Sequence, residues 1–570
     1  MKKTLHVIAF LAILCILSCK KNEPLKITGE MKAWHTITLT LPGPETTEYD
    51  TVNPFTDYRL DVEFSQGDRS FTIPGYFAAD GNAAETSARS GDRWRVHFCP
   101  PSTGDWNYKV TFLKGRNIAV ADVPASGEAC FMNGETGTFT VMNADNSAEV
   151  RTKGRLQYTG GRYLRYAATG ELFLKNGADS PENLLGYKDF DGTYYGGNNV
   201  TRSGEAAINS SLHRYEPHVK DWKEGDPSWK NGKGKGLIGG LNYLASEGVN
   251  SIYFLTMNIL GDGEDVWPYT DRNERYRFDC SKLDQWEIVF SHAENLGINL
   301  HYVLEETENQ CLLDAGRLDV QRKLYLRELI ARFSHHLAIT WNVGEEHHAA
   351  DFSPYGMTYA DTKKMADYIR KTDPYDNYIV IHTHSNNELR RKNMTEYLSF
   401  NNVDGPSIQC GDVDDVHEET RYWVNKSGGA GHQWVVNLDE IGPSWKGAMP
   451  DSFDPAHDTI RHKVLWGNLM AGGAGVEWYF GYKYPHSDLG CEDWRSRDML
   501  WDQTRLAVDF FRNNLPLEDM NSADELTEEG NYCLAKANEL YVVYLPEGKQ
   551  STLKVPAGSY DIQWFNPRTG

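Results

Sequence analysis

Two pairs of adjacent acidic residues stand where apolar segments of the chain end. Glu345–Glu346 closes the segment WNVGEE that begins at Trp341, and Asp439–Glu440 lies in the segment NLDEIG that begins at Asn437. A carboxylate next to a buried strand costs free energy unless water solvates it or the protein uses it. Two carboxyl groups that face one another, one protonated and one ionised, can cleave a glycosidic bond. These two pairs are therefore the candidate catalytic residues.

Short apolar strands alternate with helical segments between residues 150 and 515, as they do in parallel β/α units. The predicted strands cover residues 172–174, 251–255, 298–304, 337–340, 378–381, 407–409, 434–436 and 475–479. This pattern predicts a central (β/α)8 TIM barrel, whose catalytic residues lie at the carboxyl ends of the strands. The alternative is a doubly wound open sheet, but no Gly-rich phosphate fingerprint follows the first strand.

Polar or aromatic side chains follow the predicted barrel strands. Those expected to contact a substrate are Lys175, Asp179, Glu182, Asn258, Asp262, Glu306, Asn342, His382, His384, Gln409 and Trp478. No single residue in this set is specific, because any barrel has polar loops. Their convergence on the carboxyl ends of the strands is what predicts a binding site there.

Several of these residues also have a purely structural interpretation. Glu306 lies in an acidic stretch that could be a solvated loop, and Trp478 could pack inside the barrel. His382 and His384 alternate along one strand end, so at most one of them points into the barrel mouth. Asp262 lies in an acidic loop that lacks the twelve-residue pattern of a calcium site.

Two outer β domains are predicted around the barrel. Residues 27–145 alternate apolar and polar positions, with turns rich in Gly, Pro and Asp, which predicts a β-sandwich. Such a domain could bind sugar, but a packing and spacer role is the simpler interpretation. Residues 520–570 contain predicted strands at 540–544, 551–555 and 560–565. Three strands are too few to close a sandwich, so we expect a partial, truncated C-terminal β-sandwich domain.

Longer motifs resemble one group of bacterial proteins. They are NPFTDYRLD from Asn53, PGYFAADG from Pro74, KNGADSPEN from Lys175, YFLTMN from Tyr253 and GDGEDVWP from Gly261. The group carries an N-terminal domain of unknown function numbered 5060, fused to an apiosidase-like glycoside hydrolase barrel. The ending WFNPRTG resembles a collagen-binding-like β domain that often closes such proteins. The resemblance covers nearly the whole mature chain and implies a fold and an enzyme class, but no substrate.

The strand-four segment also resembles the motif Trp-Asn-x-Gly-Asn-Glu of clan A glycoside hydrolases, with Glu345 in the position of the second Asn. In that clan, the carboxyls of strands four and seven face each other at the shorter spacing, about 5–5.5 Å, that accompanies retention of configuration. The resemblance implies Glu346 as acid/base and Glu440 as nucleophile. Glu345 and Asp439 are the alternatives.

The first residues resemble an export signal. Two lysines precede an apolar run, and Ile16-Leu17-Ser18-Cys19 resembles a bacterial lipobox. This predicts a signal peptide over residues 1–18, a lipidated Cys19 and a polar tether over residues 19–26. We expect an outer-membrane lipoprotein of a Gram-negative bacterium, periplasmic or surface-exposed. The alternative is a plain cleaved signal with an incidental cysteine.

The composition excludes several classes of binding partner. The net charge of −22, from 58 basic and 80 acidic residues, argues against nucleic acid and against anionic membrane except through the lipid anchor. The sequence has no cofactor fingerprint and no CxxC or His-spaced metal pattern, so we expect neither cofactor nor metal. A monomeric glycoside hydrolase acting on a polysaccharide or oligosaccharide is the main hypothesis. A non-catalytic surface glycan-binding lipoprotein is the alternative, and collagen binding ranks lowest.

We expect Cys19 to carry the lipid, because a small residue precedes it at the end of an apolar run. Metabolic labelling of the full chain with a palmitate analogue should mark the protein, and Cys19→Ala should remove the label. Unchanged labelling of Cys19→Ala would rule out this anchor.

Overall fold

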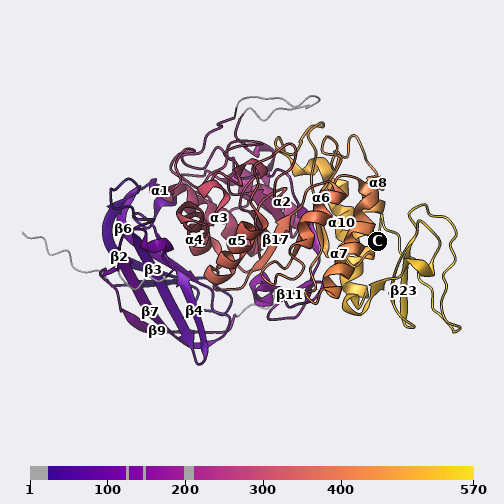
Figure 1. Ribbon diagram of the computed structural model, residues 1–570, viewed down its shortest axis with the longest axis horizontal. Helices are drawn as coiled ribbons and strands as arrows, with labels where there is room; N and C mark the ends of the chain where they lie inside the picture. Colours follow the sequence, from indigo (N-terminus) through magenta and orange to yellow (C-terminus); the bar gives the residue numbers. More distant parts are fainter. Residues whose placement is uncertain (1–23, 123–126, 145–148, 198–210) are drawn as a thin grey trace, which may run out of the picture.

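The computed structural model of the chain describes residues 24–122, 127–144, 149–197 and 211–570 (Figure 1). An N-terminal β-sandwich is followed by a closed barrel of parallel strands and by a small β-sheet near the C-terminus. Figure 1 shows the sandwich and the C-terminal sheet on opposite sides of the barrel. The predicted fold class is confirmed. The predicted signal peptide and Cys19 lie outside the described residues.

The sandwich consists of two antiparallel sheets. One has the order β1 (Lys26–Gly29), β2 (Ile37–Thr47), β6 (Ser90–Phe98), β5 (Tyr76–Phe77), and the other β4 (Arg69–Pro74), β3 (Tyr58–Gln66), β7 (Gly104–Lys114), β8 (Glu128–Ala129), with β9 (Thr136–Val141) also paired to β7. Alternate residues of β2 are buried, as expected for a strand with one face on a core. The core joins both sheets: Phe64 of β3 stacks on Phe98 of β6 with ring centroids 4.2 Å apart.

The closed barrel contains eight parallel strands. In order they are β13 (Lys175–Ala178), β14 (Ser251–Leu255), β15 (Asn299–Val303), β16 (Ile339–Asn342), β17 (Tyr378–His382), β18 (Gly405–Cys410), β19 (Asn437–Ile441) and β20 (Gly475–Trp478). Every residue of these strands is buried, because helices cover the outside and side chains fill the inside.

Helices follow or precede the barrel strands. They are α2 (Lys235–Ser246), α3 (Cys280–Leu296), α4 (Val320–Phe333), α5 (Tyr359–Thr372), α6 (Asn387–Thr395), α7 (Val416–Gly429), α8 (Asp458–Ile460), α9 (Trp466–Met470) and α10 (Asp498–Asn514), while the short α1 (Ala83–Thr86) belongs to the N-terminal part. Several begin at side-chain caps: Asp279 accepts a hydrogen bond from the Lys282 amide at the start of α3, and Asn386 caps α6 in the same way. No helix within the described ranges is both long and apolar enough to cross a membrane.

Two predicted barrel strands were misplaced. Residues 172–173 form β12, which pairs antiparallel with β11 (Leu164–Tyr166) and β10 (Leu156–Gln157), so the first barrel strand begins only at Lys175. The seventh strand is β19, which begins at Asn437, directly after the predicted run 434–436. In both cases the true strand contains ionisable residues. An apolar pattern missed it because these charges pair with one another inside the barrel.

The sheet β10–β11–β12 lies at the amino end of the barrel. The Leu156 amide donates to the Leu337 carbonyl, just before β16, at 2.7 Å. The Tyr158 hydroxyl donates to the Gln433 carbonyl, which precedes β19. This sheet therefore covers the end of the barrel opposite to the one where catalysis is expected.

The C-terminal sheet has three strands, but only one of them, β23 (Leu540–Tyr544), was predicted. The others are β21 (Asn521–Ser522) and β22 (Tyr532–Lys536). The predicted strands 551–555 and 560–565 do not form in the structure, where they have no neighbouring strand to pair with and Trp564 is 86% exposed. Tyr544 stacks on Trp466 of α9 at a centroid distance of 4.5 Å, which fixes the sheet to the barrel.

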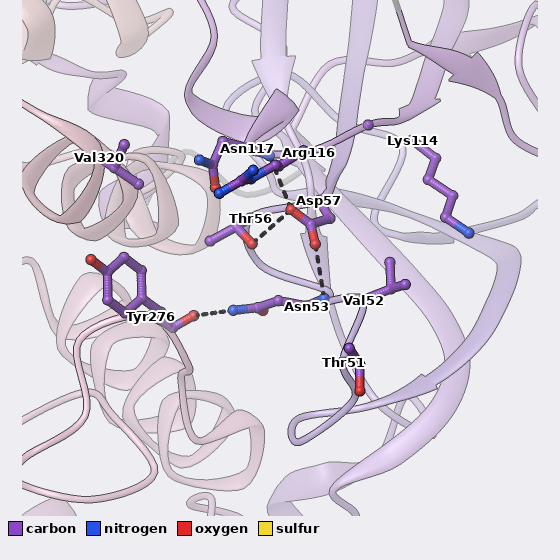
Figure 2. Close-up of a pocket in the computed structure, with 11 residues that line it drawn as sticks. Thr51, Val52, Asn53, Thr56, Asp57, Lys114, Arg116, Asn117, Tyr276 and Val320 are labelled. Carbon is purple, nitrogen blue, oxygen red and sulfur yellow. Dashed lines mark hydrogen bonds between the residues drawn. The ribbon is translucent and has the colours of Figure 1, made fainter.

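A pocket of about 670 Å³ opens between the sandwich and the barrel (Figure 2). Its sandwich wall includes Asp57, whose carboxylate accepts from the Asn117 amide at 2.9 Å and the Thr56 hydroxyl at 3.1 Å. Tyr276 forms the barrel wall, and its carbonyl accepts from the Asn53 side chain at 2.9 Å. The pocket is thus a consequence of how the two domains meet, and it is remote in sequence from the predicted catalytic segments.

Arg332 of α4 is a buried cation that connects the two domains. It donates to Glu328 at 2.7 Å, to Asp284 of α3 at 3.0 Å and to the Phe77 carbonyl of β5 at 3.0 Å. Both carboxylates are buried, and the guanidinium is their nearest compensating charge, with Arg95 a second partner of Asp284 at 3.5 Å.

Arg332→Met should therefore destabilise the protein by about 3–5 kcal/mol, because it leaves buried carboxylates without their partner. Arg512→Met, which removes a surface pair with Asp509, is the matched control and should change stability by about 0–1 kcal/mol. Differential scanning calorimetry of the full chain compares the two. Equal melting temperatures for both variants would contradict the importance of the buried pair.

Candidate active site

Two carboxyl groups meet at the carboxyl end of the barrel. A carboxylate oxygen of Glu345, one of Glu440 and a ring nitrogen of His382 all lie within 4.8 Å of one another. Glu345 follows β16, Glu440 lies in β19 and His382 ends β17. All three side chains are buried. The structure therefore brings strands four and seven together through Glu345, the alternative acid, and Glu440.

The chain turns immediately after Glu345. Glu346 has a φ of 35°, in the left-handed region that non-glycine residues seldom adopt, and it is only half-buried. Its negative charge nevertheless reaches Glu345 and Glu306. The geometry favours Glu345, the alternative assignment, as the residue that faces Glu440.

A β-bulge separates the roles of Asp439 and Glu440. Ile408 of β18 pairs with Leu438, but the next residue, Gln409, pairs with Glu440, so Asp439 is the extra residue of the bulged strand. Bulges re-aim side chains. Here Asp439 forms an ion pair with Lys175 at 2.8 Å, while Glu440 lies beside Glu345 and His382. Asp439 is therefore a charge partner inside the barrel and is not the carboxylate that faces the candidate acid.

The barrel interior below this pair holds a network of buried charges. The Lys175 ammonium contacts Asp439 at 2.8 Å and Glu477 of β20 at 3.1 Å. Glu477 also accepts from His301 Nδ1 at 2.7 Å. Gly177 leaves space for the Glu477 side chain, because a Cβ at position 177 would lie 2.3 Å from it. Burial opposes the charge of Lys175, but Asp439 and Glu477 outweigh it and raise the pKa of Lys175.

A chain of hydrogen bonds connects this network to the candidate pair. His301 Nε2 lies 3.1 Å from the side-chain nitrogen of Asn342, whose oxygen accepts from the His382 amide at 3.1 Å. His382 Nδ1 bonds the Tyr253 hydroxyl at 2.7 Å, and its Nε2 lies 3.4 Å from Glu440. Burial, followed by neighbouring positive groups, lowers the pKa of both histidines well below the usual value. Neutral His382 that accepts from Tyr253 carries its proton on Nε2, facing Glu440.

Further acidic groups surround the pair. Burial raises the pKa of Glu345 well above its usual value, and the charges of Glu306, Glu440, Glu346 and Asp179 add to the effect. Asp179, Glu182 and Glu306 have pKa values raised well above normal for the same primary reason, burial, with neighbouring carboxylates next. Glu345 can therefore hold a proton at neutral pH, as a general acid must.

The interpretation of Glu306 as part of a solvated loop is wrong. Glu306 is buried, and its neighbour Glu305 is buried too, paired with Arg322 at 2.7 Å. Burial raises the pKa of Glu305 to about 7 despite Arg322. These two residues therefore form part of the interior around the site.

Other predicted substrate contacts lie elsewhere. Lys175 begins β13 instead of following a strand, so its side chain serves the interior network. The Trp478 indole donates to Thr504 of α10 at 3.0 Å, so it packs between strand and helix. Asn258 orders its own loop by accepting from the amides of Asp265 and Val266, and Asp262 lies in this loop.

Gln409 and His384 stay near the carboxyl end of the barrel. Gln409 is the ladder partner of Glu440, and its buried side-chain oxygen has no hydrogen bond within the described residues. His384 bonds the His348 carbonyl at 3.1 Å through Nε2. Both residues are nearly inaccessible to solvent.

Sequence reasoning missed four residues around the pair: Tyr253, His301, Glu477 and Asp488. The charge of Asp488 raises the pKa of Asp179 and of Glu182, and its carboxylate accepts from the Glu182 amide at 3.2 Å. Glu477 and His301 each gave a usable signal, since an ionisable residue inside a predicted barrel strand needs a partner. Asp488 and Tyr253 gave none.

Comparison with known proteins agrees with this fold. Residues 30–113 match the family described as Domain of unknown function (DUF5060), which confirms that part of the resemblance. A solved structure from Bacteroides vulgatus ATCC 8482, provisionally described as a glycoside hydrolase, has a TM-score of 0.55 and 15% identity over 89% of this chain and 84% of that chain. A glycoside hydrolase family 5 structure from the same bacterium has a TM-score of 0.47 and 14% identity over 73% and 85%. No curated protein matches the chain. The fold is thus glycoside hydrolase-like.

Lys175→Met should destabilise the barrel, because Asp439 and Glu477 would remain buried without the ammonium that compensates them. We expect a loss of about 3–5 kcal/mol. Lys364→Met, which removes an exposed pair with Asp361 on α5, should cost about 0–1 kcal/mol. Thermal unfolding followed by circular dichroism measures both. A Lys175→Met protein as stable as the Lys364→Met control would show that the interior network is not held by this charge.

Proposed function

We propose that this chain is a retaining glycoside hydrolase in which Glu345 is the acid/base and Glu440 the nucleophile. The single observation that carries the proposal is the approach of these two carboxyls, within 4.8 Å, at the carboxyl ends of β16 and β19. Retaining enzymes place the two carboxyls about 5–5.5 Å apart, whereas inverting enzymes need roughly 6.5–9.5 Å for an intervening water. The short separation supports retention.

In the first step, ionised Glu440 attacks the anomeric carbon while protonated Glu345 gives its proton to the leaving glycosidic oxygen. The bond to that oxygen breaks, the aglycone leaves as an alcohol, and a glycosyl ester forms on Glu440. In the second step, ionised Glu345 takes a proton from water, which attacks the anomeric carbon and releases Glu440. Both carboxyls return to their starting states.

His382 and Asn342 are positioning residues in this scheme. His382 places its Nε2 3.4 Å from Glu440, close enough for the ring to hold the nucleophile's position. Asn342 supports the His382 backbone through its side-chain oxygen. We assign Asp179, Glu182 and Glu306 to contacts with sugar hydroxyls, because carboxyl groups held partly protonated can donate as well as accept hydrogen bonds.

The density of acidic groups also limits the substrate. A sugar that carries its own carboxylate or sulfate would add a further negative charge among carboxyls that already oppose one another's ionisation, and like charges in a low-dielectric site repel strongly. The proposal is therefore hydrolysis of neutral or amino-substituted glycans in preference to uronic-acid or sulfated ones.

The proposal includes a location. Residues 16–19 support export and lipidation at Cys19, which would hold a monomeric enzyme at the outer membrane of a Gram-negative bacterium. The negative net charge supports contact with membrane through the lipid alone.

Screening the full chain against a panel of neutral, amino-substituted, uronate-containing and sulfated plant and algal glycans tests the activity. We expect hydrolysis of a neutral or amino-substituted glycan, with Glu345→Gln reducing kcat by about 10²–10⁴, the usual contribution of a general acid. Glu440→Gln should prevent formation of a covalent adduct with a 2-deoxy-2-fluoro glycoside, detected by mass spectrometry of the labelled peptide.

Glu346→Gln is the matched control, since it makes the same replacement of a carboxylate oxygen by an amide nitrogen at the adjacent residue. It should retain activity within about tenfold. A collapse in Glu346→Gln with normal activity in Glu345→Gln would reverse the acid assignment. A folded protein that binds glycans without cleaving any member of the panel would instead establish the binding-protein alternative.

The pH dependence of kcat/KM should report the protonation of Glu345. Activity requires protonated Glu345, so kcat/KM should fall as the pH rises through the raised pKa of Glu345. Removing the charge of Glu440 should lower that pKa, because Glu440 is among the carboxylates that raise it. Carbon-13 NMR titration of labelled glutamates in wild type and Glu440→Gln measures the change.

A further inference from the structure

A second cluster of potential metal ligands lies where the barrel helices meet the sandwich, away from the candidate active site. It consists of Glu287 of α3 and of His335 and His336, which follow α4. His335 Nε2 lies 3.3 Å from one carboxylate oxygen of Glu287, and His336 Nε2 lies 3.2 Å from the other. The two imidazole rings are adjacent, with centroids 4.2 Å apart.

His335 has no hydrogen bond at either ring nitrogen within the described residues, although its side chain is only 1% exposed. Its approach to Glu287 does not have the direction of a hydrogen bond. A buried polar group without a partner costs about 1–3 kcal/mol, so such groups in native proteins require an explanation. A buried imidazole without a hydrogen bond, 3.3 Å from a carboxylate and adjacent to a second imidazole, is the arrangement in which a metal ion supplies the missing partner.

We propose that Glu287, His335 and His336 form a binding site for one divalent transition-metal ion, with Zn²⁺ the best match. Imidazole and carboxylate ligands suit zinc, which binds both at about 2.0–2.2 Å in tetrahedral geometry. Ligand atoms of such a tetrahedron lie about 3.3–3.4 Å apart. The two imidazole nitrogens lie 3.3 and 3.2 Å from different oxygens of Glu287, and one ligand atom from each of the three residues lies within 4.8 Å of the other two, close enough to share one ion.

The surroundings of His336 also fit a metal ligand. Its other nitrogen, Nδ1, lies 3.2 Å from Glu294, whose same oxygen accepts from the Leu337 amide at 2.8 Å. Arg151 holds the second oxygen of Glu294 at 3.1 Å. Metal-binding histidines usually donate their second ring proton to a carboxylate held in this way, which fixes the ring orientation.

The cluster is accessible from one side. The Glu287 side chain is 23% exposed, whereas His335 and His336 are 1% exposed, so water can supply the fourth ligand on the glutamate side. His97 of the sandwich faces His335 at a ring distance of 4.6 Å, but its nitrogens already bond Thr38 and Tyr76. The ion would therefore bind to barrel residues directly beneath the sandwich and stabilise this junction.

The test is metal uptake by the full chain after treatment with a chelator. We expect one Zn²⁺ per chain by mass spectrometry of the dialysed protein, and a tetrahedral visible absorption spectrum when Co²⁺ replaces it. The melting temperature should rise with added Zn²⁺. Glu287→Gln should abolish stoichiometric uptake, and Glu294→Gln should weaken affinity by about 10–100-fold, as for other groups that orient a ligand.

Two controls make the result decisive. His432→Gln, at a half-buried histidine that bonds the Val403 carbonyl, should bind Zn²⁺ as wild type does. Glu440→Gln should do so too, because it alters the candidate catalytic pair only. Failure of folded wild type to retain Zn²⁺ would overturn the proposal, as would uptake that survives Glu287→Gln. Loss of uptake in Glu440→Gln alone would place the ion in the catalytic site and equally overturn it. None of these readouts depends on glycosidase activity.

Discussion

The burial of carboxylates inside the barrel is the constraint on which the rest of the site depends. Asp439 and Glu477 are inaccessible to solvent, and isolated charges in such surroundings would be prohibitive. Lys175 lies between them and neutralises part of their charge, while His301 adds a hydrogen bond to Glu477. The interior of this barrel is therefore polar where many barrels are filled with branched apolar residues.

A series of contacts connects these buried charges to the candidate catalytic pair at the carboxyl end of the barrel. His301 holds Asn342, Asn342 holds the backbone of His382, and His382 faces Glu440. The first and last of these contacts use a histidine ring, and burial lowers the pKa of both histidines well below the usual value. Above them Glu345 is also kept neutral, because burial and nearby carboxylates oppose its ionisation. One physical cause, desolvation, thus acts on both members of the candidate pair and on the histidine between them.

The outer domains stabilise this arrangement from outside. The sandwich packs against α3 and α4, where Arg332 connects Asp284 to the Phe77 carbonyl. His335 and Glu287 meet at the same junction, and the residues after His336 continue directly into β16. The strand that precedes Glu345 is therefore connected in sequence to the interface with the sandwich, which gives the N-terminal domain a structural relation to the site.

Periodicity predicted the main elements because it depends on local sequence. The run 251–255 became β14 with the same bounds, and the polar ends of strands four and seven pointed to the correct rim. The strand containing Asp439 and Glu440 was misplaced because ionisable residues do not look apolar, although a partner elsewhere in the chain can bury them. Strands at 551–555 and 560–565 were predicted from propensity, which cannot say whether a neighbouring strand exists.

The sequence by itself determined the order of domains, the eight-strand barrel and the two acidic segments that meet at its mouth. It could not decide between Glu345 and Glu346, or between Asp439 and Glu440, because adjacent residues differ only in where the backbone points them. The left-handed turn at Glu346 and the bulge at Asp439 place Glu345 beside Glu440 and Asp439 beside Lys175. Both are properties of strands held in register by their neighbours, so only the tertiary structure could specify them.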